Sequence, residues 1–144
     1  MPASADSHSF NYDDSTVHVS GVLNTSSAPG PLNVLGGYLI NGTESFNLLP
    51  GSGYSPSGAF IYDSLLSPGA APAPMLTPHG LLFAEGTSGN PGYKEIDIWG
   101  NSGATDYTYY LWTYGAGYGP ADNDEGHLRS TRLPSRLPAR FLNP

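Results

Sequence analysis

The chain has no cysteine, which excludes disulfide bonds, thiol nucleophiles and thiolate metal sites. It also has few charges, since charged residues make up 12% of its 144 residues. No apolar run approaches the roughly 20 residues that a membrane-spanning helix needs. We therefore predict that the chain is not a transmembrane protein in this form and not a thiol enzyme.

Basic residues are scarce before residue 129. All twelve carboxylates lie between Asp6 and Glu125, a region in which Lys94 is the one lysine or arginine. An acidic body is a poor partner for nucleic acid, because phosphate binding needs cations on the contact face. We predict no nucleic-acid partner. We interpret the last sixteen residues as a short solvated extension, and they hold the four arginines Arg129, Arg132, Arg136 and Arg140.

Glycine and proline, in contrast, are abundant, with 19 and 14 residues. So many turn formers favour short strands joined by turns over a helical bundle. The aromatic content of 12% gives the chain side chains to bury, which argues against wholesale disorder. A chain of this length suits one domain.

Period-two patterns predict strands at short intervals along the chain. In residues 93–101, Ile96 and Ile98 face one way while Glu95, Asp97 and Trp99 face the other. The other candidate strands lie in 15–25, in 58–66, in 79–86, in 106–114, and on both sides of the Asn41-Gly42 turn in 36–50. We predict an antiparallel β-sandwich or jelly-roll-like fold with little or no helix.

Composition divides the chain into three parts. Residues 1–7 are predicted to be a disordered N-terminal remnant, 8–128 a single β domain, and 129–144 a basic, proline-rich disordered tail. The small residues Ala3-Ser4-Ala5 fit both the remnant of a signal-peptidase site and a chance run. The predicted core comprises Val19, Phe60, Leu82, Phe83, Ile96, Ile98 and Leu111.

Five tyrosines and a tryptophan lie within residues 105–119. On a strand, Tyr107, Tyr109 and Leu111 share one face, and the other face carries the remaining rings. Exposed aromatic rings suit stacking against a sugar, whereas rings covered on both faces are core, and we favour core for most of them. The candidate ligand-binding residues are Tyr110, Trp112, Tyr114 and Trp99.

Catalytic signals are sparse. Glu95 and Asp97 share a strand face with Cα atoms about 7 Å apart, from a rise of roughly 3.3 Å per residue. With Glu85, they are the candidate acid and base of a hydrolase. No G-x-S-x-G nucleophile motif is present.

Metal signals are similarly incomplete. Asp122 and Asp124 resemble the start of a calcium loop, but Leu133 occupies the twelfth position, where a glutamate is needed. An isolated acidic turn is favoured over a calcium site. The histidines His8, His18, His79 and His127 lack metal-ligand spacing and are expected in structural or surface roles.

The segments VSGVLNT, GGYLINGTESFNLLP, GAFIYDSLLSPGAAPAPMLTPHGLLFAEG, EIDIWGNSG and YTYYLWTYGAGYG follow one another in a characteristic order. In that order, over residues 10–128, the chain resembles bacterial exoproteins of the PEP-CTERM sorting class. The resemblance implies an all-β protein exported by a Gram-negative bacterium into an exopolysaccharide-rich matrix, and it supplies no catalytic residues. The chain lacks the Pro-Glu-Pro and apolar helix of that class, so we expect a truncated or differently read C-terminus beyond about Leu128.

Three function hypotheses follow. The first is a non-catalytic extracellular or matrix protein that binds or organises surface polysaccharide through exposed aromatic residues. The second is a small secreted hydrolase of esters or glycans that uses strand carboxylates. The third is a structural matrix protein that associates with itself through strand edges.

Overall fold

The computed structural model describes residues 5–27, 31–119 and 123–133 of the chain. These residues form antiparallel strands, and the all-β prediction is confirmed. The elements are β1 (Ala5–Asp13), β2 (His18–Ser26), β3 (Leu32–Asn41), β4 (Glu44–Leu48), β5 (Gly53–Tyr54), β6 (Ile61–Tyr62), β7 (Leu65–Leu66), the 3₁₀ turn η1 (Pro68–Ala70), β8 (Leu81–Glu85), β9 (Lys94–Gly100), β10 (Tyr107–Thr113), β11 (Gly117–Tyr118) and β12 (Asn123–Arg132).

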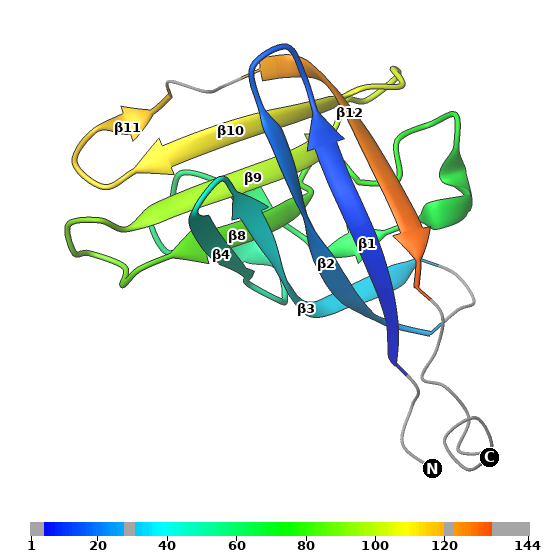
Figure 1. The fold of residues 1–144 in the computed structure, drawn as a ribbon, viewed down its shortest axis with the longest axis horizontal. Helices are drawn as coiled ribbons and strands as arrows, with labels where there is room; N and C mark the ends of the chain where they lie inside the picture. The colour runs from blue at the N-terminus through cyan, green and yellow to red at the C-terminus, as the bar shows by residue number, and fades with distance from the viewer. Residues whose placement is uncertain (1–4, 28–30, 120–122, 134–144) are drawn as a thin grey trace.

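Within the described residues, eight strands close into a barrel. The strand order is β10-β12-β1-β2-β3-β4-β8-β9, and β9 pairs with β10 to complete the ring. Figure 1 shows β8, β9 and β10 running across one side while β1, β2 and β12 cross them steeply on the other. This differs from the predicted sandwich or jelly roll, because β12 pairs with β1 as well as β10 and so joins what would be two separate sheets.

Alternating side chains fill the barrel. On β9, Ile96 and Ile98 point inward, and on β10 the inward residues are Tyr107 and Tyr109. Of the predicted core, Val19, Phe83, Ile96 and Ile98 lie in this interior, and Leu111 is partly buried against it. Phe60 and Leu82 are buried too, but in a second cluster on the outer face of β8–β10.

The first and last strands extend beyond the predicted domain boundaries at residues 8 and 128. β1 begins at Ala5 and β12 continues to Arg132, which pairs with His8. Hydrophobic patterning could not reveal β12, because its inward positions include Gly126, Ser130 and Arg132. The remainder of the predicted tail, residues 134–144, lies outside the described residues.

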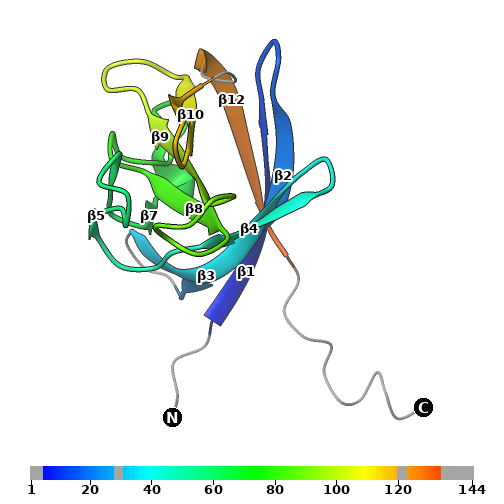
Figure 2. The same cartoon turned by 90° about the vertical axis from the view of Figure 1, so that its left-hand side faces the viewer.

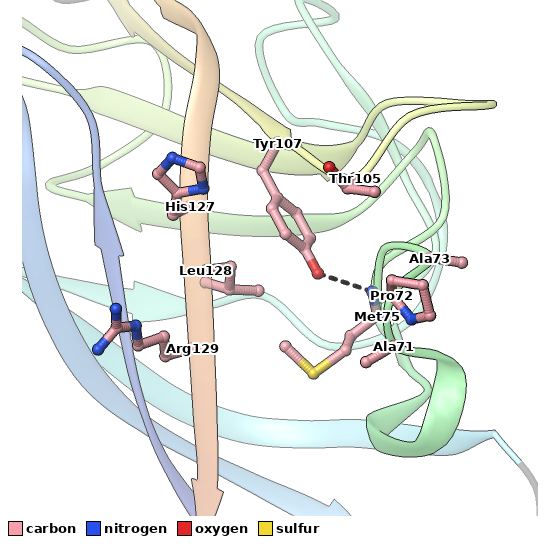
Figure 3. A pocket seen from close by; sticks show the side chains of 9 residues that line it. All are labelled: Ala71, Pro72, Ala73, Met75, Thr105, Tyr107, His127, Leu128 and Arg129. Atoms are coloured by element: carbon pink, nitrogen blue, oxygen red, sulfur yellow. Dashed lines mark hydrogen bonds between the residues drawn. The ribbon is translucent and has the colours of Figure 1, made fainter.

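Closure of the barrel is incomplete along β12. β10 pairs with β12 only at Tyr107↔Gly126 and Tyr109↔Asn123. Farther along, the loop after η1 lies beside β12, and the Met75 N–H donates a 2.8 Å hydrogen bond to the Tyr107 hydroxyl (Figure 3). A small cavity of about 240 Å³ remains there, lined by Ala71, Pro72, Ala73, Met75, Thr105, Tyr107, His127, Leu128 and Arg129. The loop thus takes the place of a neighbouring strand.

A close contact between Tyr12 of β1 and Gly126 fixes the position of β12 beside β1. The ring of Tyr12 is fully buried and stacks on Tyr109 with ring centroids 5.3 Å apart. The same ring lies over Gly126, where an added Cβ would overlap it. Gly126 therefore provides the space that lets the closing strand approach the aromatic core.

We predict that Gly126→Ala lowers the free energy of unfolding by about 1–3 kcal/mol, because the methyl group overpacks the Tyr12 site. Urea denaturation measures this difference. Gly36→Ala on β3 is the matched control, because a Cβ there has no neighbour closer than 4.0 Å. The control should be neutral or stabilising by up to about 1 kcal/mol. A Gly126→Ala protein as stable as the wild type would contradict this packing.

Candidate functional site

The outer face of β8, β9 and β10 is covered by residues 49–64, here called the cover segment. Phe60 and Tyr62 of this segment pack on Leu82 of β8. A short antiparallel pair, β5 with β6, shapes the segment. Figure 2 shows β5 on the side of β8 and β9 that faces away from β1 and β2. Residues that a simple barrel would expose on this face therefore become buried.

Glu95 fastens the cover segment to the barrel. Its side chain is fully buried, and Ser57 donates to it from the backbone N–H at 3.0 Å and from the hydroxyl at 2.5 Å. The Tyr93 hydroxyl donates a third hydrogen bond at 2.6 Å. Burial, together with this bond to Glu95, raises the pKa of Tyr93. Glu95, a predicted acid or base, thus accepts three hydrogen bonds and links the cover segment to β9.

Asp97 lies one outward position farther along β9 and is only 1% exposed. Its Oδ1 has no hydrogen-bond partner among the described residues. Burial raises the pKa of Asp97 well above its usual range, and the negative charges of Asp63 and Glu95 add to the shift. The surroundings thus favour the protonated carboxylic acid, which can both donate and accept a hydrogen bond.

Asp97 lines a pocket between β9 and the cover segment, here called the outer pocket. Its volume is about 260 Å³. Trp99 forms part of the lining, and its ring lies against Tyr110 with centroids 5.2 Å apart and planes tilted by 43°. The described residues that line it are Ala59, Phe60, Ile61, Pro78, His79, Asp97 and Trp99. A buried acid and an indole in one small pocket can bind a molecule that has both hydroxyl groups and an apolar face.

The other predicted aromatic residues do not line this pocket. Tyr110 is partly buried against Trp99. Trp112 is also partly buried, and its ring and that of Tyr93 form an edge-to-face pair with centroids 6.4 Å apart. Tyr114 is 42% exposed at the end of the strand. Of the four predicted ligand-binding residues, Trp99 therefore lines the outer pocket and the other three do not. Sequence reasoning missed Phe60 as a pocket residue, since only the folded cover segment brings it to β9.

Glu85 is apart from Asp97. It belongs to a cluster with Glu44 and Lys94, in which the Lys94 ammonium lies 2.8 Å from a Glu44 oxygen. A hydrogen bond with Glu44 raises the pKa of Glu85. The three predicted carboxylates therefore do not converge on one site.

No group of three or more His, Asp or Glu side chains that could hold a metal ion is found in the described residues. Asp124 lies on β12, and Asp122 falls outside the described part of the chain. Of the four histidines, His79 and His127 line separate pockets, His18 pairs with Asp13 at 2.8 Å, and His8 is buried.

Comparisons with known proteins assign no family to this geometry. No protein-family model matches the chain, and neither the curated proteins nor the solved structures include a match. Among the residues described, no helix has the length and apolar character of a membrane span. Function is therefore inferred from the outer pocket and from the sequence.

We predict that Ser57→Ala lowers the free energy of unfolding by about 1.5–3 kcal/mol, because a hydrogen bond to the buried Glu95 carboxylate is lost. Chemical denaturation gives the value. Ser52→Ala, at an exposed position of the same segment, is the control and should change stability by no more than about 0.5 kcal/mol. Equal effects of the two substitutions would show that Glu95 does not fasten the cover segment.

Asp97 should also leave a signature in the pH dependence of stability. An unfolded aspartate loses its proton near pH 3.9, whereas the folded protein retains it to higher pH. Between these two pKa values the folded state binds more protons, so the Asp97 contribution to stability falls as pH rises, by up to about 1.4 kcal/mol per unit. The measurement is the stability of the wild type minus that of Asp97→Asn from pH 4 upward. A pH-independent difference would refute the raised pKa.

Proposed function

We propose that the chain is a non-catalytic protein, exported by a Gram-negative bacterium, that binds extracellular polysaccharide with one sugar residue in the outer pocket. The observation that carries this proposal is Asp97, a buried carboxyl in a pocket also lined by Trp99. One of its oxygens has no hydrogen-bond partner among the residues that the structure describes. An unpartnered buried polar atom costs about 1–3 kcal/mol, and a ligand hydroxyl would offset that cost.

Sugar chemistry matches the two parts of the outer pocket. A pyranose has an apolar face of C–H groups that can lie on the Trp99 indole, while its hydroxyls both donate and accept hydrogen bonds. The protonated form of Asp97 has the complementary donor and acceptor. Exposed Ile61 and His79 stand at the rim, where a longer chain of sugars could continue.

Export into a polysaccharide matrix is supported by the sequence. The order of segments over residues 10–128 resembles exported PEP-CTERM proteins, and the body is acidic with a single lysine. Self-association through strand edges has less support, because each barrel strand in the described residues has a strand partner on both sides for at least part of its length.

A glycan hydrolase is the second candidate, favoured by the raised pKa of Asp97, since a general acid needs a retained proton. Hydrolysis also needs a second, free carboxylate as base or nucleophile. Glu95 is engaged by three hydrogen bonds, and Asp63 accepts hydrogen bonds from the Thr77 hydroxyl and the Leu65 N–H. This engagement favours binding over catalysis.

We predict that Trp99→Ala weakens binding to an insoluble bacterial exopolysaccharide about tenfold, through loss of the stacking surface. Trp112→Ala is the matched control. Trp112 packs against the same outer hydrophobic cluster as Trp99, but it does not line the outer pocket. Depletion from solution by the polysaccharide measures both. Equal loss in the two variants, or none in either, would remove the outer pocket as the binding site.

Substitution of Asp97 separates the two candidate functions. Asparagine retains a donor and an acceptor, so Asp97→Asn should retain binding, whereas Asp97→Leu should lose it. Release of reducing sugar should be undetectable in all forms. Turnover by the wild type that Asp97→Asn abolishes would establish the hydrolase instead.

A further inference from the structure

A third and larger cavity lies at one end of the barrel, here called the mouth pocket. Its volume is about 440 Å³, within the range of small-molecule sites, and barrel mouths commonly hold such sites. None of the described residues lines both this pocket and the outer pocket. Its lining is Asp6, His8, Leu32, Pro68, Gly69, Ser130 and Arg132.

The polar residues of the mouth pocket occupy inward positions of β1 and β12. On β1, Asp6 and His8 continue the inward series of Phe10 and Tyr12. On the neighbouring strand, Ser130 lies opposite Phe10, and Arg132 opposite His8. The interior therefore changes from aromatic to polar at this end. A purely structural barrel end needs no buried polar groups there.

Two buried polar atoms of the mouth pocket lack a hydrogen-bond partner in the part of the chain that the structure describes. His8 is 3% exposed, and neither its Nε2 nor the Ser130 Oγ has a hydrogen-bond partner within the described residues. Each such atom costs stability unless something binds to it. Burial lowers the pKa of His8, which favours the neutral imidazole, with one nitrogen as donor and the other as acceptor.

The charges of the mouth pocket cancel. The Arg132 guanidinium lies 3.1 Å from an Asp6 carboxylate oxygen, and the two form an ion pair. An ionic ligand would have to compete with this pair, whereas an uncharged ligand leaves it intact. Leu32 and Pro68 supply apolar surface for the body of such a ligand.

We propose that the mouth pocket binds a small uncharged molecule that has an apolar body and one hydroxyl group, such as a phenol. The hydroxyl bonds to His8 Nε2 and to Ser130 Oγ. This arrangement suits both imidazole tautomers. If Nε2 has no proton, the ligand hydroxyl donates to Nε2 and accepts from Ser130. If Nε2 is protonated, the ligand hydroxyl accepts from Nε2 and donates to Ser130. The apolar body lies toward Leu32 and Pro68.

Three probes of similar size test the proposal on the full chain: p-cresol, toluene and benzoate. Titration calorimetry and NMR shifts report binding. p-Cresol should bind about tenfold more tightly than toluene, because only its hydroxyl satisfies the two buried atoms. Benzoate should bind more weakly than p-cresol, since its charge competes with Asp6 for Arg132. Equal affinity for p-cresol and toluene, or preferential binding of benzoate, would overturn the proposal.

Variants then locate the site. Ser130→Ala should weaken p-cresol binding about fivefold to tenfold and leave toluene binding within about twofold, whereas Ser130→Thr retains the hydroxyl and the preference. Leu32→Trp should fill the cavity and block both probes. Trp99→Ala should leave p-cresol binding unchanged, so failure at the mouth pocket is distinguishable from failure at the outer pocket. Unchanged p-cresol affinity in Ser130→Ala, or its loss in Trp99→Ala, would refute the assignment.

Discussion

Pairing of β12 with both β1 and β10 is the constraint on which the rest of the structure depends. It joins the two ends of the described chain and turns a row of hairpins into a closed ring. The cost of closure appears at Gly126, where only a hydrogen fits beside the Tyr12 ring. Because β10 pairs with β12 over only a few residues, the loop after η1 completes the wall. One cavity is lined by that loop, and another is lined by η1.

The outer pocket results from the burial of the outward face of β9 under the cover segment. Strand β9 carries two carboxyl groups on its outward face, and the cover segment buries both. Glu95 receives three hydrogen bonds in the process, whereas one Asp97 oxygen has no hydrogen-bond partner in the described part of the chain. One of the two carboxyl groups thus contributes to stability, and we propose that its neighbour on the same face binds a ligand hydroxyl. The two roles depend on Ser57 and Tyr93, not on the carboxylates themselves.

The period-two pattern of β9 and β10 was sufficient to predict which residues face the barrel interior. Ile96 and Ile98 follow that pattern without exception, because a strand between a core and an outer face must alternate. The closed barrel was not predictable, because β12 has small and polar inward residues such as Gly126 and Ser130, and its position is set by pairing with β1. The outer pocket was only half predictable. Asp97 and Trp99 occupy successive outward positions of β9, which the period-two pattern predicts. Phe60 reaches them through the fold of the cover segment, for which the sequence has no local signal.

The cover segment also links binding to local unfolding. Its two short strands, β5 and β6, pair over only two residues each, so it has much less hydrogen bonding of its own than the barrel beneath it. Segments of this kind open more readily than the strands that support them. Opening would remove Phe60 and Ile61 from Trp99 and expose the Asp97 carboxyl to water while the barrel stays folded. A bound sugar would hold the segment closed, so occupancy should appear as slower amide hydrogen exchange there and not in β1 or β2.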